Sequence, residues 1–182
     1  MNDSEIDSAD IEKIRILVVG PAATGKTAII KKYLYSKFSE IYAMTMGGEV
    51  LVKLIDHDGK KVDLIINDLP GENRFKVARE SFYPGASGAL LVFDLTRYTT
   101  YNPGLFERLK ELWENSGKIP TIVIGNKKDL ADEGYRSIKK EDILNYCGKI
   151  PCDYIETSAK DGTGIKEAFN TLIDKILKDS KD

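Results

Sequence analysis

Cysteine and histidine are scarce in this sequence. Its 182 residues contain only Cys147, Cys152 and His57 of these two types. Two cysteines are too few for a disulfide scaffold, and we expect both to be small apolar core residues of a protein in a reducing compartment. A structural zinc site takes about four cysteine or histidine ligands, so this composition argues against a zinc-binding module. We expect His57 to be solvated, because a polar turn sequence surrounds it.

Long apolar runs and an excess of one charge are also missing. No run approaches the ~20 residues that span a bilayer. The 27 basic and 29 acidic side chains leave a formal net charge of -2, so charge gives no reason to expect a nucleic-acid partner. We expect a flexible arm at residues 1–12 and a short tail at residues 179–182. Without a secretory signal, a polybasic anchor or a prenylation cysteine, we expect a cytoplasmic protein with no lipid anchor of its own, recruited to membranes only by partners.

Short apolar runs alternate with segments of helical period along residues 13–178. This pattern predicts one three-layer α/β domain with a six-stranded, mostly parallel sheet, one antiparallel strand and helices on both faces. Asp58-Gly59 predicts a tight hairpin, because that turn needs positive φ angles. The expected strands are 14–19, 50–55, 62–66, 89–93, 121–124 and 154–156, and the expected helices are 26–36, 105–115, 138–147 and the segment after Gly164.

The first expected strand ends in a loop of small residues that matches G-x-x-x-x-G-K-[ST] in full: Gly20-Pro21-Ala22-Ala23-Thr24-Gly25-Lys26-Thr27. Small residues let backbone N–H groups curl around a phosphate chain, and the following helix adds a partial positive charge at its start. Lys26 can reach the β- and γ-phosphates, and the Thr27 hydroxyl can bind Mg²⁺, which prefers oxygen ligands. The motif predicts a P-loop NTPase domain but does not identify the base.

Two later motifs bear on the base. In Asn126-Lys127-Lys128-Asp129, the Asp129 carboxylate can accept from the N1–H and 2-amino groups of guanine. Adenine has neither donor and would leave that carboxylate unpaired, at a cost of roughly 1.5–3 kcal/mol. Asn126 can tie neighbouring loops together, and the Lys127 stem can lie over the purine ring. In Glu156-Thr157-Ser158-Ala159-Lys160, the Ala159 N–H can reach the guanine O6.

A fourth motif, Asp68-Leu69-Pro70-Gly71-Glu72, ends another expected strand. Asp68 can hold Mg²⁺ through water. Gly71 can bring its N–H close to a γ-phosphate and serve as a hinge. The motif therefore completes a site for a triphosphate and its metal ion.

In this order and spacing, the four motifs resemble the Ras superfamily of small GTPases, closest to its Rab and Ras branches. The resemblance implies a molecular switch that binds GDP or GTP with Mg²⁺ and hydrolyses GTP, slowly without an activating partner. It also implies a first switch at about residues 38–48 and a second at about 68–83, which contact effector, exchange and GTPase-activating proteins. The implied metal ligands are Thr27, Thr45 and, through water, Asp68.

The resemblance assigns a wider set of site residues. It places the base-stacking aromatic on Phe38 and the tyrosine that covers the phosphates on Tyr42. It implies catalytic roles for Glu72, Lys26 and Gly71. The nucleotide-binding set that it implies is Ala22, Ala23, Thr24, Gly25, Lys26, Thr27, Ala28, Phe38, Tyr42, Thr45, Gly71, Asn126, Lys127, Asp129, Ser158, Ala159 and Lys160.

Glu72 departs from the family, which usually has a glutamine there to orient the attacking water. Glutamine offers a donor and an acceptor, whereas an ionised glutamate offers acceptors alone and is repelled by charge on the γ-phosphate. Ala22 and Ala23 stand where many relatives carry glycine, and Arg74 is a weak candidate for charge stabilisation.

A hydrolysis-poor, GTP-binding scaffold or regulatory subunit therefore stays open as the alternative. An ATP-dependent P-loop kinase or ATPase is a third hypothesis, against which Asp129 argues.

Overall fold

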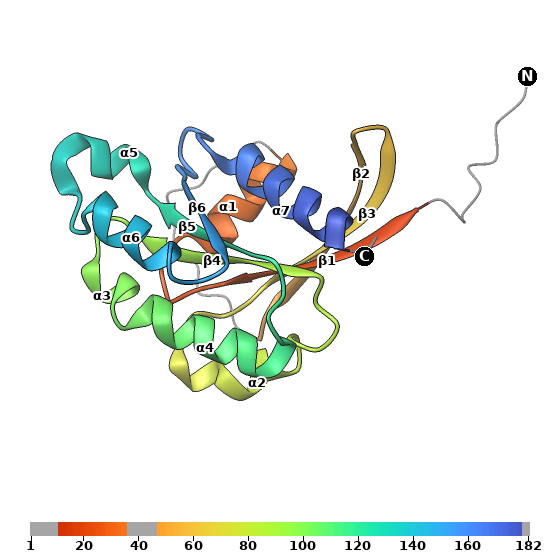
Figure 1. The fold of residues 1–182 in the computed structure, drawn as a ribbon, viewed down its shortest axis with the longest axis horizontal. Coiled ribbons are helices and arrows are strands. Elements are labelled where there is room, and N and C mark those ends of the chain that lie inside the picture. Colours follow the sequence, from red (N-terminus) through yellow and green to blue (C-terminus); the bar gives the residue numbers. More distant parts are fainter. Residues whose placement is uncertain (1–10, 36–46, 180–182) are drawn as a thin grey trace, which may run out of the picture.

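The computed structural model describes residues 11–35 and 47–179. Within them a six-stranded sheet runs in the order β2-β3-β1-β4-β5-β6 (Figure 1). Neighbouring strands are parallel except for the antiparallel pair β2 and β3. The strands are β1 (Glu12–Val19), β2 (Glu49–His57), β3 (Lys60–Asp68), β4 (Gly88–Asp94), β5 (Thr121–Asn126) and β6 (Cys152–Glu156). The predicted α/β fold is thereby confirmed.

Helices cover both faces of this sheet, because the central strands are apolar on both sides. Along β4, Leu90 and Val92 belong to one core cluster, and Ala89, Leu91 and Phe93 belong to the other. In Figure 1, α1 and α7 lie on one side of the sheet and α2 and α4 on the other. The helices are α1 (Lys26–Tyr35), α2 (Lys76–Glu80), α3 (Tyr98–Tyr101), α4 (Gly104–Ser116), α5 (Lys128–Leu130), α6 (Lys140–Cys147) and α7 (Ile165–Asp179), with a 3₁₀ turn at Asn73–Phe75 and a π-helical turn at Ala131–Tyr135.

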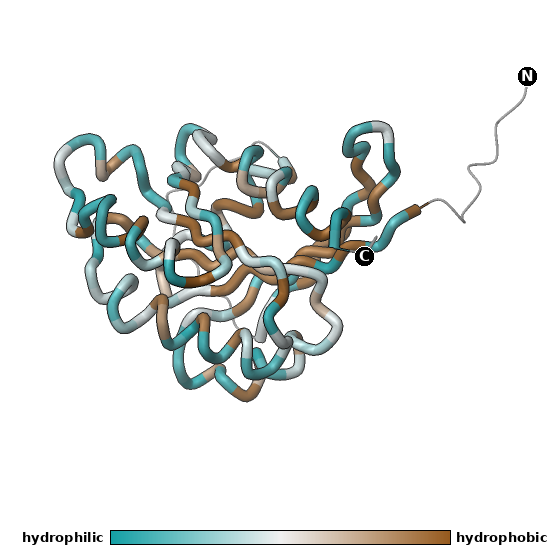
Figure 2. Tube along the Cα trace, in the orientation of Figure 1, coloured by the Kyte–Doolittle hydropathy of each residue, from teal (hydrophilic) through white to brown (hydrophobic). Residues whose placement is uncertain are grey.

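The helix α7 has the clearest amphipathic pattern of the chain. Its apolar residues recur at helical spacing and are buried against the sheet: Ile165, Ala168, Phe169, Leu172, Ile173, Ile176 and Leu177. In the hydropathy view of Figure 2, apolar residues gather along the central strands and on the helix sides that face them. Cys147 and Cys152 are free and buried in the core cluster that α4 and α6 share, which confirms them as apolar core residues.

The hairpin between β2 and β3 confirms one prediction and corrects another. Asp58 and Gly59 have φ angles of 50° and 80°, as a tight hairpin turn requires. His57, however, is buried rather than solvated, so that prediction was wrong. Its Nε2 atom lies 2.7 Å from Asp174 Oδ1 on α7. The ring is covered because the hairpin meets a helix that lies more than a hundred residues further along the chain.

The segment after β3 also differs from expectation. The expected helices include none between the strands 62–66 and 89–93, but α2 spans Lys76–Glu80. Arg79 is fully buried, which is rare for a charged side chain unless it is paired.

Among the described residues, no helix is both long and apolar enough to cross a bilayer.

Candidate nucleotide site

The predicted motifs meet at one edge of the sheet, where the parallel strands end. The phosphate-loop sequence follows β1, Asp68 ends β3, Asn126 ends β5 and Glu156 ends β6. Because these strands are parallel, their carboxyl ends lie side by side, and this edge is where α/β sheets bind ligands. Tertiary contacts then bring the motifs together.

The loop between β1 and α1 has the geometry of a phosphate cradle. The Lys26 amine donates to the carbonyls of Gly20 and Pro21, at 3.0 and 2.8 Å. Gly25 has a φ angle of 95°, and a Cβ atom there would lie 2.3 Å from Asn126 Nδ2. Glycine is therefore required where the base motif closes over the phosphate loop.

Burial lowers the pKa of Lys26 to about 8, although the charges of Asp68 and Glu72 act in the opposite direction. Taking an ammonium group out of water disfavours its charged form. Phosphate oxygens beside this amine would favour the charged form again. The protonation state of the buried Lys26 amine therefore depends on whether phosphate oxygens lie beside it.

Thr27 and Asp68, both expected from the sequence to hold the metal ion, are in direct contact. The Thr27 hydroxyl, in the first turn of α1, donates to a carboxylate oxygen of Asp68 at the end of β3. Asp68 is 1% exposed. A hydroxyl and a carboxylate oxygen next to a phosphate cradle fit Mg²⁺, which combines few protein oxygens with water and phosphate ligands. The third expected ligand, Thr45, lies outside the described residues, as do Phe38 and Tyr42.

Gly71 lies directly against the phosphate loop. A Cβ atom at Gly71 would come within 2.5 Å of the Ala22 nitrogen and 2.6 Å of the Ala22 Cα atom. Because those neighbours are backbone atoms, a side chain at position 71 would force the two loops apart. Glu72 is half-buried, and its charge acts on Lys26. The fourth motif thus places Gly71 and Glu72 beside the cradle.

Asn126 connects three loops at the base side of the site. Its Nδ2 atom donates to the Thr24 carbonyl at 2.8 Å, and its Oδ1 atom accepts from the Thr157 hydroxyl at 3.0 Å. Oδ1 also accepts from the Ala159 N–H, which the sequence assigned to guanine O6, over a long 3.3 Å. The Ser158 hydroxyl donates to Asp129 at 2.7 Å and orients the carboxylate predicted to read guanine. Lys160 is exposed at the rim.

Two residues that the sequence analysis did not select connect the base motif with the phosphate loop. Asp94 is fully buried at the end of β4, and its Oδ2 atom lies 2.7 Å from the Lys127 amine. Burial opposes ionisation of Asp94, but hydrogen bonds from Lys127 and Thr96 prevail and lower its pKa. Arg97 donates both to Asp94 and to the Ala22 carbonyl. The sequence signal that could have identified Asp94 is a polar residue at the end of an apolar strand, on the same edge as the motifs.

Comparison with known proteins identifies the family of this fold and site. The profile of the Ras family matches residues 15–178. The chain belongs to the Ras family. The Ras-related protein Rab-13 of Canis lupus familiaris is 32% identical over 90% of this chain and 79% of its own length. The Ras-related proteins RABA4a of Arabidopsis thaliana and Rab-32C of Dictyostelium discoideum are 34% and 36% identical over 90% of this chain, and over 71% and 73% of their own lengths.

Membership of the Ras family makes this chain a Rab-like, GTP-binding small GTPase switch. Members of the family bind GTP and GDP with Mg²⁺ and hydrolyse GTP. The described residues supply groups that fit this chemistry: a buried lysine in the phosphate loop, a contacting hydroxyl and carboxylate, and a carboxylate oriented by Ser158. The predicted set also includes Ala22 and Ala23, which lie in the loop between β1 and α1, and Ala28, which lies in the first turn of α1.

Proposed function

We propose that this chain hydrolyses GTP in a Mg²⁺-dependent reaction and signals the bound nucleotide through its switch loops. The observation that carries the proposal is the Thr27–Asp68 pair beside Lys26, with Gly71 packed on the phosphate loop. Thr27 and Asp68 would hold Mg²⁺, and Lys26 would bind the β- and γ-phosphates. Asp129, oriented by Ser158, would read guanine.

In this proposal Gly71 donates its N–H to the γ-phosphate, and Glu72 orients the attacking water through its carboxylate oxygens. Mg²⁺, when bound by Thr27 and Asp68, would neutralise charge on the phosphates. The ionised Glu72 also places negative charge near the γ-phosphate, where further negative charge develops during transfer. Hydrolysis without an activating partner is therefore slow. Glu72 also favours the second candidate function, a GTP-bound scaffold with negligible turnover.

We assign partner contacts to the two switches, at about residues 38–48 and 68–83. The described part of the second switch supports this assignment, because Val77 on α2 is 80% exposed. An exposed apolar side chain beside half-buried Phe75 suits the adaptable surface that effector, exchange and activating proteins contact. We also propose that the protein acts in the cytoplasm and reaches membranes by recruitment.

Single-turnover GTP hydrolysis, with and without Mg²⁺, tests the proposed activity. Glu72→Gln keeps an acceptor oxygen and removes the charge. We therefore expect hydrolysis about tenfold faster than in the wild type, which corresponds to an activation barrier about 1.4 kcal/mol lower. Glu72→Ala removes the acceptor, and we expect hydrolysis at least about tenfold slower. Glu80→Gln on α2, whose carboxylate pairs loosely with Lys76 at 3.9 Å, is the matched control.

The outcomes separate the two candidate functions. Mg²⁺-dependent turnover that responds to both Glu72 variants, but not to Glu80→Gln, supports the hydrolytic switch. A wild type that keeps GTP intact for hours supports the scaffold. Normal turnover in Glu72→Ala would contradict the proposed contact between Glu72 and water.

A further inference from the structure

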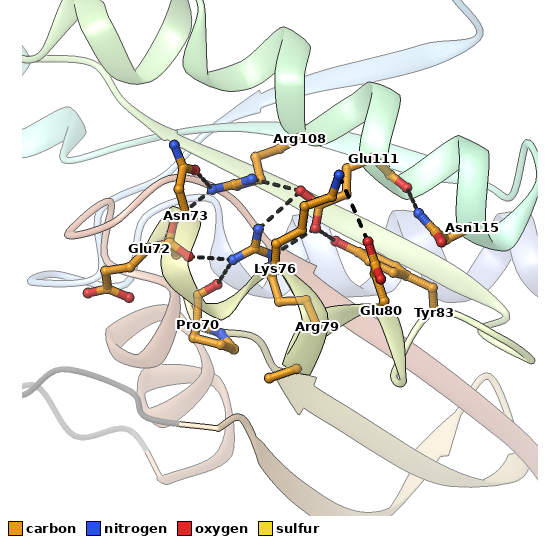
Figure 3. A network of polar contacts seen from close by, with 12 residues as sticks. Pro70, Glu72, Asn73, Lys76, Arg79, Glu80, Tyr83, Arg108, Glu111 and Asn115 are labelled. Atoms are coloured by element: carbon orange, nitrogen blue, oxygen red, sulfur yellow. Dashed lines mark hydrogen bonds and ion pairs between the residues drawn. The ribbon is translucent and has the colours of Figure 1, made fainter.

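Three consecutive carbonyl groups of the second switch accept hydrogen bonds from two buried arginines (Figure 3). Arg79 Nη1 donates to the carbonyls of Pro70 and Glu72, at 3.1 and 2.6 Å. Arg108 Nη2 donates to the Gly71 carbonyl at 2.9 Å and to Asn73 Oδ1 at 2.5 Å. Both guanidinium groups are buried, with side chains 1% and 7% exposed. The backbone from Pro70 to Glu72 is therefore fixed at every residue.

Glu111 and Tyr83 hold the two arginines in place. Arg79 forms a two-pronged ion pair with Glu111, through Nε at 2.8 Å and Nη2 at 3.1 Å. Arg108 Nη1 donates to the same carboxylate at 2.7 Å, and the Tyr83 hydroxyl donates to it at 2.8 Å. One buried carboxylate thus joins two cations that would otherwise repel each other.

This network connects the switch to the rigid core. Arg108 and Glu111 belong to α4, whose apolar face is buried against the sheet through Leu105, Leu109 and Leu112. The planar guanidinium groups present their N–H donors in fixed directions, so they orient the carbonyls that they contact. A lysine ammonium group, which rotates freely, would not orient them in this way. The position of Pro70, Gly71 and Glu72 is therefore set by α4 and not by the loop alone.

The other side of the same segment faces the nucleotide site. Gly71 touches the Ala22 backbone, and the charge of Glu72 acts on Lys26. In Figure 3 the Glu72 side chain points away from both arginines, while its carbonyl accepts from Arg79. The carbonyls are thus held on one side, and the groups proposed to contact the γ-phosphate and the attacking water lie on the other.

We propose that Arg79 and Arg108 are positioning residues, which hold Gly71 and Glu72 in place for GTP hydrolysis through a Glu111-centred clamp anchored on α4. This inference rests on the proposed roles of Gly71 and Glu72. Neither arginine contacts the reacting groups, so the clamp acts on the geometry of turnover and not on the affinity for GDP. A displacement of about 1 Å at reacting groups is enough to slow an enzyme about a hundredfold.

Two variants test the clamp while the charges of Arg79, Arg108 and Glu111 stay balanced. Arg108→Lys keeps the positive charge but loses the fork, and Asn73→Ala removes one contact from an exposed residue, so it leaves the fold intact. Lys110→Gln is the control, because that side chain is exposed on the same helix, 75% accessible. Each full-length protein is measured for single-turnover GTP hydrolysis, GDP dissociation, melting temperature and hydrogen exchange of the amides from Gly71 to Asn73.

We expect Arg108→Lys to slow hydrolysis about tenfold or more, and Asn73→Ala to slow it less, with GDP dissociation unchanged and faster exchange of the switch amides. Equal rates and equal exchange in wild type and both variants would overturn the clamp. Arg108→Lys could instead lower melting temperature, GDP binding and turnover together, while Asn73→Ala has no effect. That result would mean that the network only stabilises the fold, and it would overturn the proposed positioning role. If the wild type itself does not hydrolyse GTP, the proposed function fails, and the amide exchange alone decides whether the clamp exists.

Discussion

In the proposed function, base selectivity depends on Asp129. Its carboxylate lies at the carboxyl edge of the sheet and accepts from the Ser158 hydroxyl at 2.7 Å, which leaves acceptor capacity for the N1–H and 2-amino groups of guanine. Asp129→Asn exchanges an acceptor for a donor at this point. We expect GDP affinity to fall at least about tenfold and xanthosine diphosphate affinity to rise, because xanthine presents an oxygen where guanine has its amino group.

Equilibrium titration with GDP, ADP and xanthosine diphosphate measures this change. Asp132→Asn is the control, because that carboxylate pairs with Lys128 at the surface, outside the site. An unchanged preference for GDP in Asp129→Asn would contradict the assigned base site. ADP binding as tight as GDP binding in the wild type would favour the ATP-dependent alternative.

We expect Lys26 to make nucleotide binding depend on pH. Its pKa is lowered to about 8, so the amine loses its proton above about pH 8 in the free protein. Phosphate oxygens favour the charged amine and raise that pKa in the complex. GDP binding should therefore take up a proton just above pH 8, and affinity should fall as pH rises further.

Calorimetry of GDP binding in buffers of different ionisation enthalpy measures this proton uptake. Lys110→Met, which removes an exposed amine from α4, should leave it unchanged. A binding enthalpy that is independent of the buffer just above the Lys26 pKa would contradict the prediction.

At the scale of elements, the β2–β3 hairpin is attached to α7 through His57 and Asp174. The 2.7 Å contact joins a buried ring to a half-exposed carboxylate, and it connects the edge hairpin to the helix that closes one face. His57→Ala removes this hydrogen bond and leaves space behind it. We expect the free energy of unfolding to fall by about 1–2 kcal/mol.

Urea denaturation of His57→Ala measures the loss. Lys60→Ala is the matched control at the same hairpin, because its amine lies 3.9 Å from Glu12 and both side chains are largely exposed. The control should cost less than about 0.5 kcal/mol. Equal effects of the two substitutions would mean that the contact with α7 adds nothing to stability.

At the scale of the whole molecule, α7 and α1 close one face of the sheet together. Phe169 of α7 is fully buried and stacks on Tyr33 of α1, with ring centroids 3.8 Å apart and an interplanar angle of 8°. Phe169→Ala opens a cavity between two helices and the sheet. We expect a loss of about 3–5 kcal/mol of unfolding free energy, which is a large part of the total for a domain of this size.

Urea denaturation again provides the measurement, with Phe169→Leu as a milder control because it preserves most of the buried volume. Phe169→Ala should lower the unfolding midpoint more than Phe169→Leu, with a similar denaturant slope. A loss below about 1 kcal/mol in Phe169→Ala would contradict the assigned position of this ring in the core.

The order of motifs along the chain was sufficient to predict where the site lies. Each motif follows a strand, and parallel strands end at one edge, so the order of the chain alone places Lys26, Asp68 and Asn126 at that edge. The hairpin was equally predictable, because Asp58-Gly59 is a local signal with a conformational cause. The predictions for Phe38, Tyr42 and Thr45 lie outside the described residues.

By itself, the sequence determined the alternation of strands and helices and the positions of the phosphate-loop motif and the Asn126–Asp129 motif, because apolar periodicity and short spacings are local properties. Only the tertiary structure decided that His57 is buried, that Asp94 holds Lys127, and that Arg79 and Arg108 share Glu111. The contacts His57–Asp174, Asp94–Lys127 and Arg79–Glu111 join different segments of the chain, over as many as 117 residues. Arg108 and Glu111 both belong to α4, but the carbonyl that Arg108 fixes lies in another segment. From sequence alone, a polar or charged residue is predicted to be exposed, because burial is costly without a partner. Its partner, which offsets that cost, becomes known only from the tertiary structure.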